Sequence, residues 1–163
     1  MKFACVGIMM LLSLAIADPA TEKGKEKEKE TDLDRMQGTW LVVSLVEEGK
    51  AVDAKETAIL KIVIQKDNFR VLENDKLVVN DRITIDETKM PRAIDFTHLS
   101  GDDKGKTELG IYVFEKGQLK ICVNEKAKER PTVFDGKEAS TYSVIVLKKE
   151  KAAEKEKEKE KDK

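Results

Sequence analysis

Gln37-Gly38-Thr39-Trp40 opens a run of short apolar segments that extends to Leu147. Gly38 allows the backbone to bend sharply where the first strand starts, and Trp40, the only tryptophan of the chain, is large enough to plug one end of a β-barrel. A Gly-x-Trp motif is weak on its own, but here it stands at the head of a series of strands and turns. We therefore expect Gly38 and Trp40 to close one end of a barrel, with the Trp40 side chain buried.

The segments that follow this motif have the two-residue period of half-buried strands. In residues 58–65, for example, Leu60, Ile62 and Ile64 share one face. Turn signals such as Asn74-Asp75 and Lys116-Gly117 separate one segment from the next. About eight or nine strands are expected, at residues 40–46, 58–65, 69–73, 77–79, 82–86, 93–99, 109–115, 119–124 and 140–148. Helical turns are expected only at residues 53–57 and 126–130. This spacing predicts an all-β fold, a small antiparallel up-and-down barrel of about eight strands.

The start of the chain has the features of a secretory signal peptide. Lys2 precedes an apolar stretch at residues 3–16, and Ala15-Ile16-Ala17 is a small-x-small cleavage site. The stretch is shorter than the roughly 20 residues that a membrane-spanning helix needs. We therefore expect a signal peptide at residues 1–17, export to the periplasm or the cell exterior, and no membrane insertion after cleavage.

Lysine and glutamate dominate both ends of the chain that cleavage would leave. Residues 22–30 and 148–163 consist almost entirely of charged side chains, so neither segment has much apolar area to bury. Residues four apart in the second segment, such as Glu154 and Glu158, carry the same charge, which weakens a helix. The expected organisation is a charged linker at 18–32, a barrel domain at 33–149 and a disordered or marginally helical Lys/Glu tail at 150–163.

The charge balance and the cysteines exclude some partners. The chain has 31 Lys and Arg against 32 Asp and Glu, a net charge of −1, and its weakly acidic body lacks the basic stripe that nucleic acids and anionic membranes require. Signal cleavage would remove Cys5 and leave Cys122 without a partner for a disulfide. We expect Cys122 to be a small buried residue rather than a reactive thiol or an intermolecular bridge. No particular oligomeric state follows from the sequence.

Three groups of residues could suggest chemistry, and the first is centred on His98, the only histidine. Carboxylates lie near it in the sequence, at Asp95, Asp102, Asp103 and Glu108. A zinc site ordinarily needs several His or Cys ligands, and an acid-base dyad needs a nucleophile or a substrate pocket. We therefore expect His98 to be solvated or at a strand edge, with no metal bound.

The other two groups are a loop and an arginine. The loop Gly101-Asp102-Asp103-Lys104-Gly105 has carboxylates that Ca²⁺ could use, but it lacks the spaced oxygen ligands of an EF-hand, and Lys104 opposes a cation. A hairpin loop is expected there. Arg130 could be a cation at the mouth of a cavity, or it could stack on an aromatic ring or pair with a carboxylate; we favour the structural roles. No catalytic residue, cofactor or metal site is expected, and we do not expect an enzyme.

Several ordered motifs of the body resemble those of one family. They are Leu33-Asp34-Arg35-Met36-Gln37-Gly38-Thr39-Trp40, Lys89-Met90-Pro91-Arg92-Ala93-Ile94-Asp95, Leu109-Gly110-Ile111-Tyr112, Leu119-Lys120-Ile121-Cys122 and Arg130-Pro131-Thr132-Val133-Phe134. Together they are similar to a lipocalin-like domain of unknown function that recurs as paralogues in planctomycete bacteria. The resemblance covers the body of the chain and implies a lipocalin-like barrel in a secreted or envelope setting. It implies no established activity and no catalytic positions.

Two functions fit a small barrel of this kind. An eight-stranded barrel has an interior just wide enough to be filled by side chains or to hold one small ligand. An exported barrel could therefore bind a small apolar ligand; alternatively, a barrel with a filled interior would be a structural module or would interact with an envelope protein. A continuous cavity of about 300 Å³ or more with one or two convergent polar groups would favour the binding function.

Overall fold

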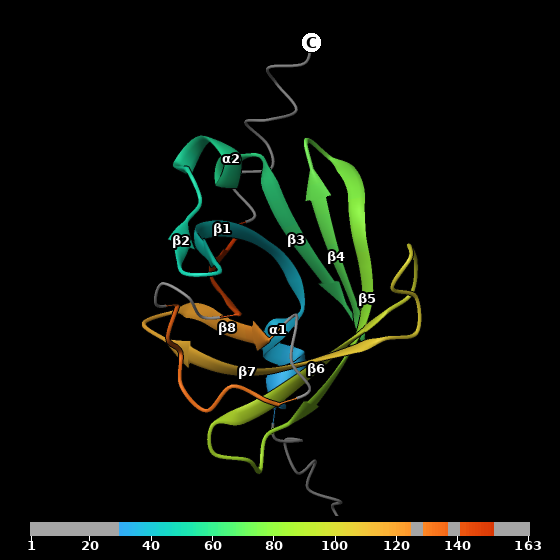
Figure 1. The fold of residues 1–163 in the computed structure, drawn as a ribbon, viewed down its shortest axis with the longest axis vertical. Helices are drawn as coiled ribbons and strands as arrows, with labels where there is room; N and C mark the ends of the chain where they lie inside the picture. The colour runs from blue at the N-terminus through green and yellow to red at the C-terminus, as the bar shows by residue number, and fades with distance from the viewer. Residues whose placement is uncertain (1–29, 125–128, 137–140, 152–163) are drawn as a thin grey trace, which may run out of the picture.

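Eight strands close into an antiparallel barrel in the computed structural model, which describes residues 30–124, 129–136 and 141–151 (Figure 1). They are β1 (Gly38–Glu47), β3 (Leu60–Gln65), β4 (Asn68–Glu73), β5 (Lys76–Asp86), β6 (Arg92–His98), β7 (Thr107–Glu115), β8 (Gln118–Asn124) and β9 (Tyr142–Lys149). Each of these strands pairs with the next one along the chain, and β1 also pairs with β9, which closes the barrel. The predicted up-and-down barrel of about eight strands is therefore confirmed.

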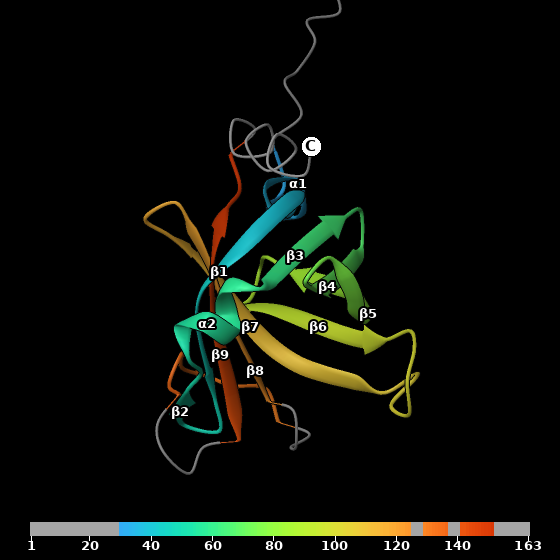
Figure 2. The same cartoon turned by 90° about the horizontal axis from the view of Figure 1, so that it is seen from above.

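Three short elements complete the part of the chain that the structure describes. α1 (Asp32–Met36) comes before β1, whereas β2 (Lys50–Ala51) and α2 (Ala54–Ala58) lie between β1 and β3. Because β1 and β3 are antiparallel, their first residues lie toward opposite ends of the barrel. α1 therefore lies at one end, and β2 with α2 at the other, as Figures 1 and 2 show. α2 corresponds to the helical turn expected at residues 53–57; residues 126–128 of the other expected turn lie outside the described residues.

Two boundaries differ from the sequence-based expectation. The strands expected at 77–79 and 82–86 are one strand, β5, because β4 and β6 pair with it on both sides through the intervening residues. Asp32, expected in the charged linker, is instead the first residue of α1 and is buried. The Thr31 side chain caps this helix by accepting a hydrogen bond from the backbone N–H of Asp34, so the folded domain begins at Thr31. The signal peptide at 1–17, the linker up to residue 29 and residues 152–163 of the tail lie outside the described residues.

α1 and Trp40 lie together at one end of the barrel. Trp40 is buried, as expected, with only 2% of its surface exposed, and its indole Nε1 donates a hydrogen bond of 2.7 Å to the carbonyl oxygen of Met36. Gly38 has a φ of +114°, a conformation that residues with a side chain rarely adopt. The chain therefore turns at Gly38 from the helix into β1, and Trp40 is carried under α1.

A network of polar side chains ties α1 to the barrel. Asp32 accepts hydrogen bonds from the guanidinium groups of Arg35 and Arg92 and, at 2.9 Å, from the hydroxyl of Tyr112. Burial and the neighbouring Asp32 raise the pKa of Tyr112 well above its ordinary value, so the hydroxyl keeps its proton and stays a donor. The carboxylate of Asp32 thus connects the helix to β6 and β7.

Apolar side chains pack on both faces of the curved sheet. A large cluster occupies the interior: Met36, Trp40, Ile62, Ile64, Phe69, Ile83, Ile94, Phe96, Tyr112, Leu119, Ile121 and Leu147. A smaller cluster lies on the outer face, where Phe134 packs against Ile111, Cys122 and Val144. Cys122 is fully buried, as expected, and burial raises its pKa to about 11. The thiol is therefore held in its unreactive protonated form.

Candidate functional site

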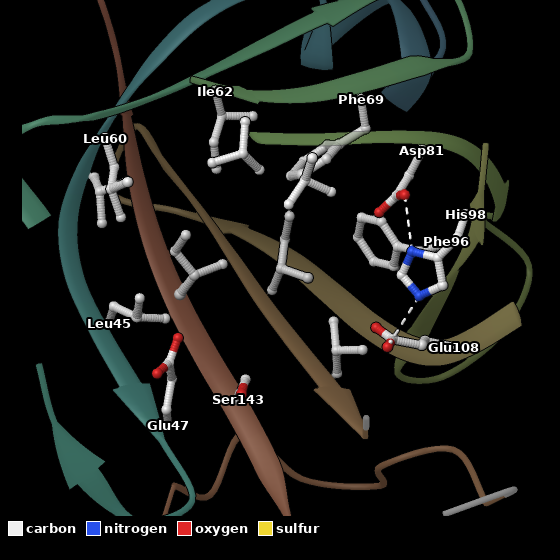
Figure 3. A pocket seen from close by; sticks show the side chains of 16 residues that line it. Leu45, Glu47, Leu60, Ile62, Phe69, Asp81, Phe96, His98, Glu108 and Ser143 are labelled. Carbon is white, nitrogen blue, oxygen red and sulfur yellow. Dashed lines mark hydrogen bonds and ion pairs between the residues drawn. The ribbon is translucent and has the colours of Figure 1, made fainter. Parts of the chain in front are cut away.

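A cavity of about 330 Å³ occupies the part of the barrel interior that lies away from α1 (Figure 3). All eight barrel strands contribute to its wall, through Val42, Leu45, Glu47, Leu60, Ile62, Phe69, Val71, Val79, Asp81, Phe96, His98, Glu108, Ile121, Val123, Ser143 and Ile145. The cavity exceeds the volume of about 300 Å³ that marks the lower range of small-molecule sites. The interior is thus filled at the α1 end and hollow toward the other end.

The size of the inward-facing side chains explains this difference. At the α1 end the interior holds Trp40, Met36 and Tyr112, which are large and almost fully buried. Toward the other end, small side chains such as Val79 and Ser143 line the wall. The interior of an eight-stranded barrel is just wide enough for side chains to fill, so small inward residues leave space that large ones would occupy.

Three polar side chains form one wall of the cavity. Asp81 of β5 lies opposite His98 of β6 in the antiparallel register. Glu108 of β7 lies opposite Phe96, which is two residues before His98 and therefore on the same face of β6. Residues so placed on neighbouring strands have adjacent side chains. His98 Nδ1 is 2.9 Å from Asp81 Oδ1, and His98 Nε2 is 3.1 Å from Glu108 Oε1. The imidazole ring is therefore held between two carboxylates, as the dashed lines in Figure 3 show.

The two carboxylates determine the charge of His98. Burial of the ring lowers its pKa, but the hydrogen bonds to Asp81 and Glu108 and the negative charges of these two carboxylates together outweigh this effect, so the pKa of His98 is raised above the ordinary value of 6.5. In the protonated ring both nitrogens are donors, one to each carboxylate. Neither nitrogen is then left to take a proton from a nucleophile. The arrangement suits recognition of a ligand by charge and hydrogen bonding better than general-base catalysis.

The opposite wall carries two further polar side chains, Glu47 of β1 and Ser143 of β9 (Figure 3). Within the described ranges, the Glu47 side chain makes no hydrogen bond or ion pair with another residue. No Lys or Arg is among the described residues that line the cavity. The site therefore combines an apolar middle with acidic groups on two sides.

The histidine environment differs from the sequence-based expectation. His98 is the last residue of β6, which pairs with β5 on one side and β7 on the other, so it does not lie on an edge strand. Its side chain is only 17% exposed, so the ring is mostly buried rather than solvated. Asp95 contacts Arg130 and does not line the cavity, and Asp102 and Asp103 are exposed in the loop that follows β6. Of the carboxylates that lie near His98 in the sequence, Glu108 is the one that contacts its ring.

Sequence reasoning missed Asp81, the second partner of His98. The signal was present in the alternation of β5, where Val79, Asp81, Ile83 and Ile85 occupy every second position. A carboxylate among residues that face the core is unusual enough to suggest a site. The error of placing a break between Val79 and Arg82 concealed this pattern.

Arg130 lies on the outer face of the barrel and does not line the cavity, so the suggested cavity-mouth role is wrong. Its Nη1 donates hydrogen bonds of 2.6 Å to the Gly110 carbonyl and 3.2 Å to the Ile94 carbonyl. The same nitrogen is 2.6 Å from Asp95 Oδ1. Pairing with a carboxylate, rather than stacking on a ring, is the role that the structure shows. Arg130 thereby fastens the segment 129–136 to β6 and β7.

The loop after β6 carries two carboxylates, those of Asp102 and Asp103, that a cation could use. Asp103 pairs with Lys106, and hydrogen bonding to this lysine lowers the pKa of Asp103. Among the described residues, no group of three or more His, Cys, Asp or Glu side chains is arranged to hold a metal ion. Within the same residues, no helix has the length and apolar character needed to cross a membrane.

Comparisons with family models, with curated proteins and with solved structures find no match for this chain. The functional interpretation therefore depends on the geometry and chemistry of the cavity itself.

Proposed function

We propose that the protein binds one small, largely apolar molecule in the barrel cavity. The observation that carries this proposal is an open-ended cavity of about 330 Å³ to which all eight strands contribute and which is lined mostly by Val, Leu, Ile and Phe. Sites for small molecules are typically apolar hollows of roughly 300–1,000 Å³ with a few placed polar groups. A ligand at the lower end of that range fits this barrel.

The cavity favours binding over the alternative of a filled structural or protein-interaction module. Filling would have left no continuous space among Val71, Val79 and Val123. Catalysis is a weaker proposal, because the only histidine already contacts a carboxylate through each ring nitrogen. We therefore propose a binding protein with no reaction of its own.

The setting of this function is also a proposal. Residues 1–17 have the pattern of a secretory signal, which supports export to the periplasm or the cell exterior. The ordered motifs from Leu33 to Phe134 support membership of the lipocalin-like domain family of planctomycete bacteria. Such a barrel would collect its ligand outside the cytoplasm, and an envelope protein would be a fitting partner.

Native mass spectrometry of the full chain, purified gently from its own host, tests the binding proposal. We expect a non-covalent complex with a molecule small enough for the cavity, and saturable binding of octanol by the protein after that molecule is removed. A protein that carries no ligand and does not bind octanol or comparable apolar probes would contradict the proposal.

A cavity-filling variant shows where the molecule binds. Val123→Trp places a large side chain in the cavity wall and should abolish both the complex and octanol binding. Val43→Trp is the matched control, because Val43 lies on β1, is 49% exposed and does not line the cavity. Equal loss of binding in both variants, or in neither, would place the bound molecule elsewhere.

A further inference from the structure

We propose that the ligand of this cavity carries a positively charged group, of the ammonium type, attached to its apolar body. This inference rests on the proposed binding function and specifies the chemical class of the ligand. It follows from the charges of the side chains that line the cavity, from their positions, and from the burial and hydrogen bonding of the carboxylates.

The charge of the wall is negative whatever the state of the histidine. Glu47, Asp81 and Glu108 line the cavity together with His98, and no lining residue among those described is a lysine or arginine. A protonated His98 leaves a net charge of −2 on these four side chains, and a neutral ring leaves −3. The titration of His98 therefore changes the size of the negative charge but not its sign.

The acidic groups lie on two sides of an apolar space. In Figure 3, Asp81 and Glu108 flank His98 on one wall, whereas Glu47 lies on the other wall beside Ser143. Apolar side chains such as Ile62 and Phe69 line the space between the two walls. A molecule that fills the apolar space therefore has a carboxylate near each of its ends. An ammonium group at either end of the molecule is attracted to the carboxylate that lies there.

Asp81 is the most buried of the three carboxylates that line the cavity. Its side chain is only 7% exposed, and its partner among the described residues is the imidazole of His98, which contacts Oδ1. An ionised carboxylate offers about four acceptor sites on its two oxygens, so this contact leaves capacity for a donor in the cavity. Charges act more strongly on one another at such a site than in bulk water.

Glu47 supports the same conclusion from the other wall. It makes no side-chain hydrogen bond or ion pair among the described residues, and it borders both the cavity and the surface at β2 and α2. A carboxylate with no partner at the rim of an apolar cavity attracts cations from solution and repels anions. A fatty acid would place its own carboxylate against these groups, and such juxtaposition of like charges is strongly unfavourable.

Three probes with the same apolar body separate the charge preference from cavity binding. Octylammonium, octanol and octanoate are titrated into the full-length protein by calorimetry near neutral pH, where the amine is protonated, as lysine is, and the acid is ionised. We expect octylammonium to bind at least about tenfold more tightly than octanol, and octanoate to bind most weakly. Added salt should reduce the preference for the amine and leave octanol binding unchanged.

Charge-neutral variants assign the preference to the cavity wall. Glu47→Gln keeps the size of the side chain and, because Glu47 is exposed and has no partner among the described residues, it should not disturb the fold. It should weaken octylammonium binding several-fold with no effect on octanol. Asp81→Asn should have the same selectivity effect from the other wall. Glu73→Gln is the matched control, because Glu73 is exposed at the end of β4 and does not line the cavity.

Each outcome has a separate meaning. Octanol binding without any preference for octylammonium would overturn the charge inference and leave the binding function intact. Octanoate binding as tight as octylammonium binding would also overturn the charge inference alone. So would a preference for octylammonium over octanol that survives in both Glu47→Gln and Asp81→Asn. Failure of all three probes to bind would overturn the proposed function and this inference together.

Discussion

The two ends of the barrel use polar residues in different ways. At the α1 end, Asp32 is surrounded by Arg35, Arg92 and Tyr112, and large side chains fill the space between the strands. At the other end, Asp81, His98 and Glu108 also contact one another, but they border an open volume of about 330 Å³. One network is completed within the protein, and the other faces a space that a ligand can occupy.

This difference separates stability from function along the barrel axis. Filling an interior with large, well-packed side chains stabilises the folded state, and a cavity gives up part of that stabilisation. Substitutions near α1 should therefore act mainly on the free energy of unfolding. Substitutions around the cavity should act mainly on binding.

The largest loss of stability is expected from Trp40→Ala. The substitution removes a side chain that is almost fully buried beneath α1, together with its hydrogen bond to the Met36 carbonyl. Unfolding by denaturant should show a loss of about 3–5 kcal/mol, the usual range for large aromatic residues in a core. Val43→Ala, on the exposed face of the same strand, should change stability by less than about 0.5 kcal/mol. A loss below about 1 kcal/mol for Trp40→Ala would show that this end is not tightly packed.

A smaller loss is expected from Asp32→Ala, which removes the acceptor shared by Arg92 and Tyr112. The free energy of unfolding should fall by about 2–3 kcal/mol, because hydrogen bonds to a charged group are lost and the Tyr112 hydroxyl stays buried without its acceptor. Tyr112→Phe alone should cost about 1 kcal/mol. In the double variant the two losses should be less than additive, since they break the same hydrogen bond. Full additivity would contradict the described network.

His98, which lines the cavity, should make a modest, pH-dependent contribution to the free energy of unfolding. The pKa of His98 is raised in the folded state, so its contribution to stability is fully present below the unfolded pKa of about 6.5 and is lost as the pH rises through the raised folded value. The groups that produce the shift are Asp81 and Glu108, with Asp103 nearby. Because the chain has one histidine, its imidazole proton signals can be followed without overlap by NMR. A midpoint below about 6.5, or a stability difference from His98→Gln that grows with rising pH, would contradict this account.

Metal ions are expected to have no effect on the stability of the folded protein. His98 already contacts a carboxylate through each ring nitrogen, Asp103 pairs with Lys106, and a divalent ion would have to displace these contacts. Thermal unfolding with chelator, with millimolar Ca²⁺ and with excess Zn²⁺ should therefore give one midpoint, since only an ion that binds the native state raises it. A saturable upward shift that is lost in His98→Ala or Asp102→Ala would identify a cation site that the geometry does not suggest.

Local rules were enough to predict the barrel, because each strand carries its own two-residue period and each hairpin its own turn residues. At Asn74-Asp75 and at Lys116-Gly117, both central residues have the positive φ of tight hairpin turns. α1 was missed because five residues give too little periodicity, although Thr31 and Asp34 have the spacing of a capping box. The cavity could not be predicted, because its volume depends on side chains from all eight strands at the same level of the barrel. The Asp81–His98 contact depends on the register between β5 and β6, which sequence alone left open.

Methyl NMR with octanol as the added ligand tests the central claim most directly, because it probes both ends of the barrel in one experiment. Saturable shifts are expected for the methyl groups of Val71, Val79 and Val123, which line the cavity. No comparable shift is expected for Met36 beneath α1 or for Leu147 in the filled part of the interior. Shifts confined to the outer cluster around Val144, or the absence of any saturable shift, would contradict the claim that the hollow end of the barrel is a ligand site.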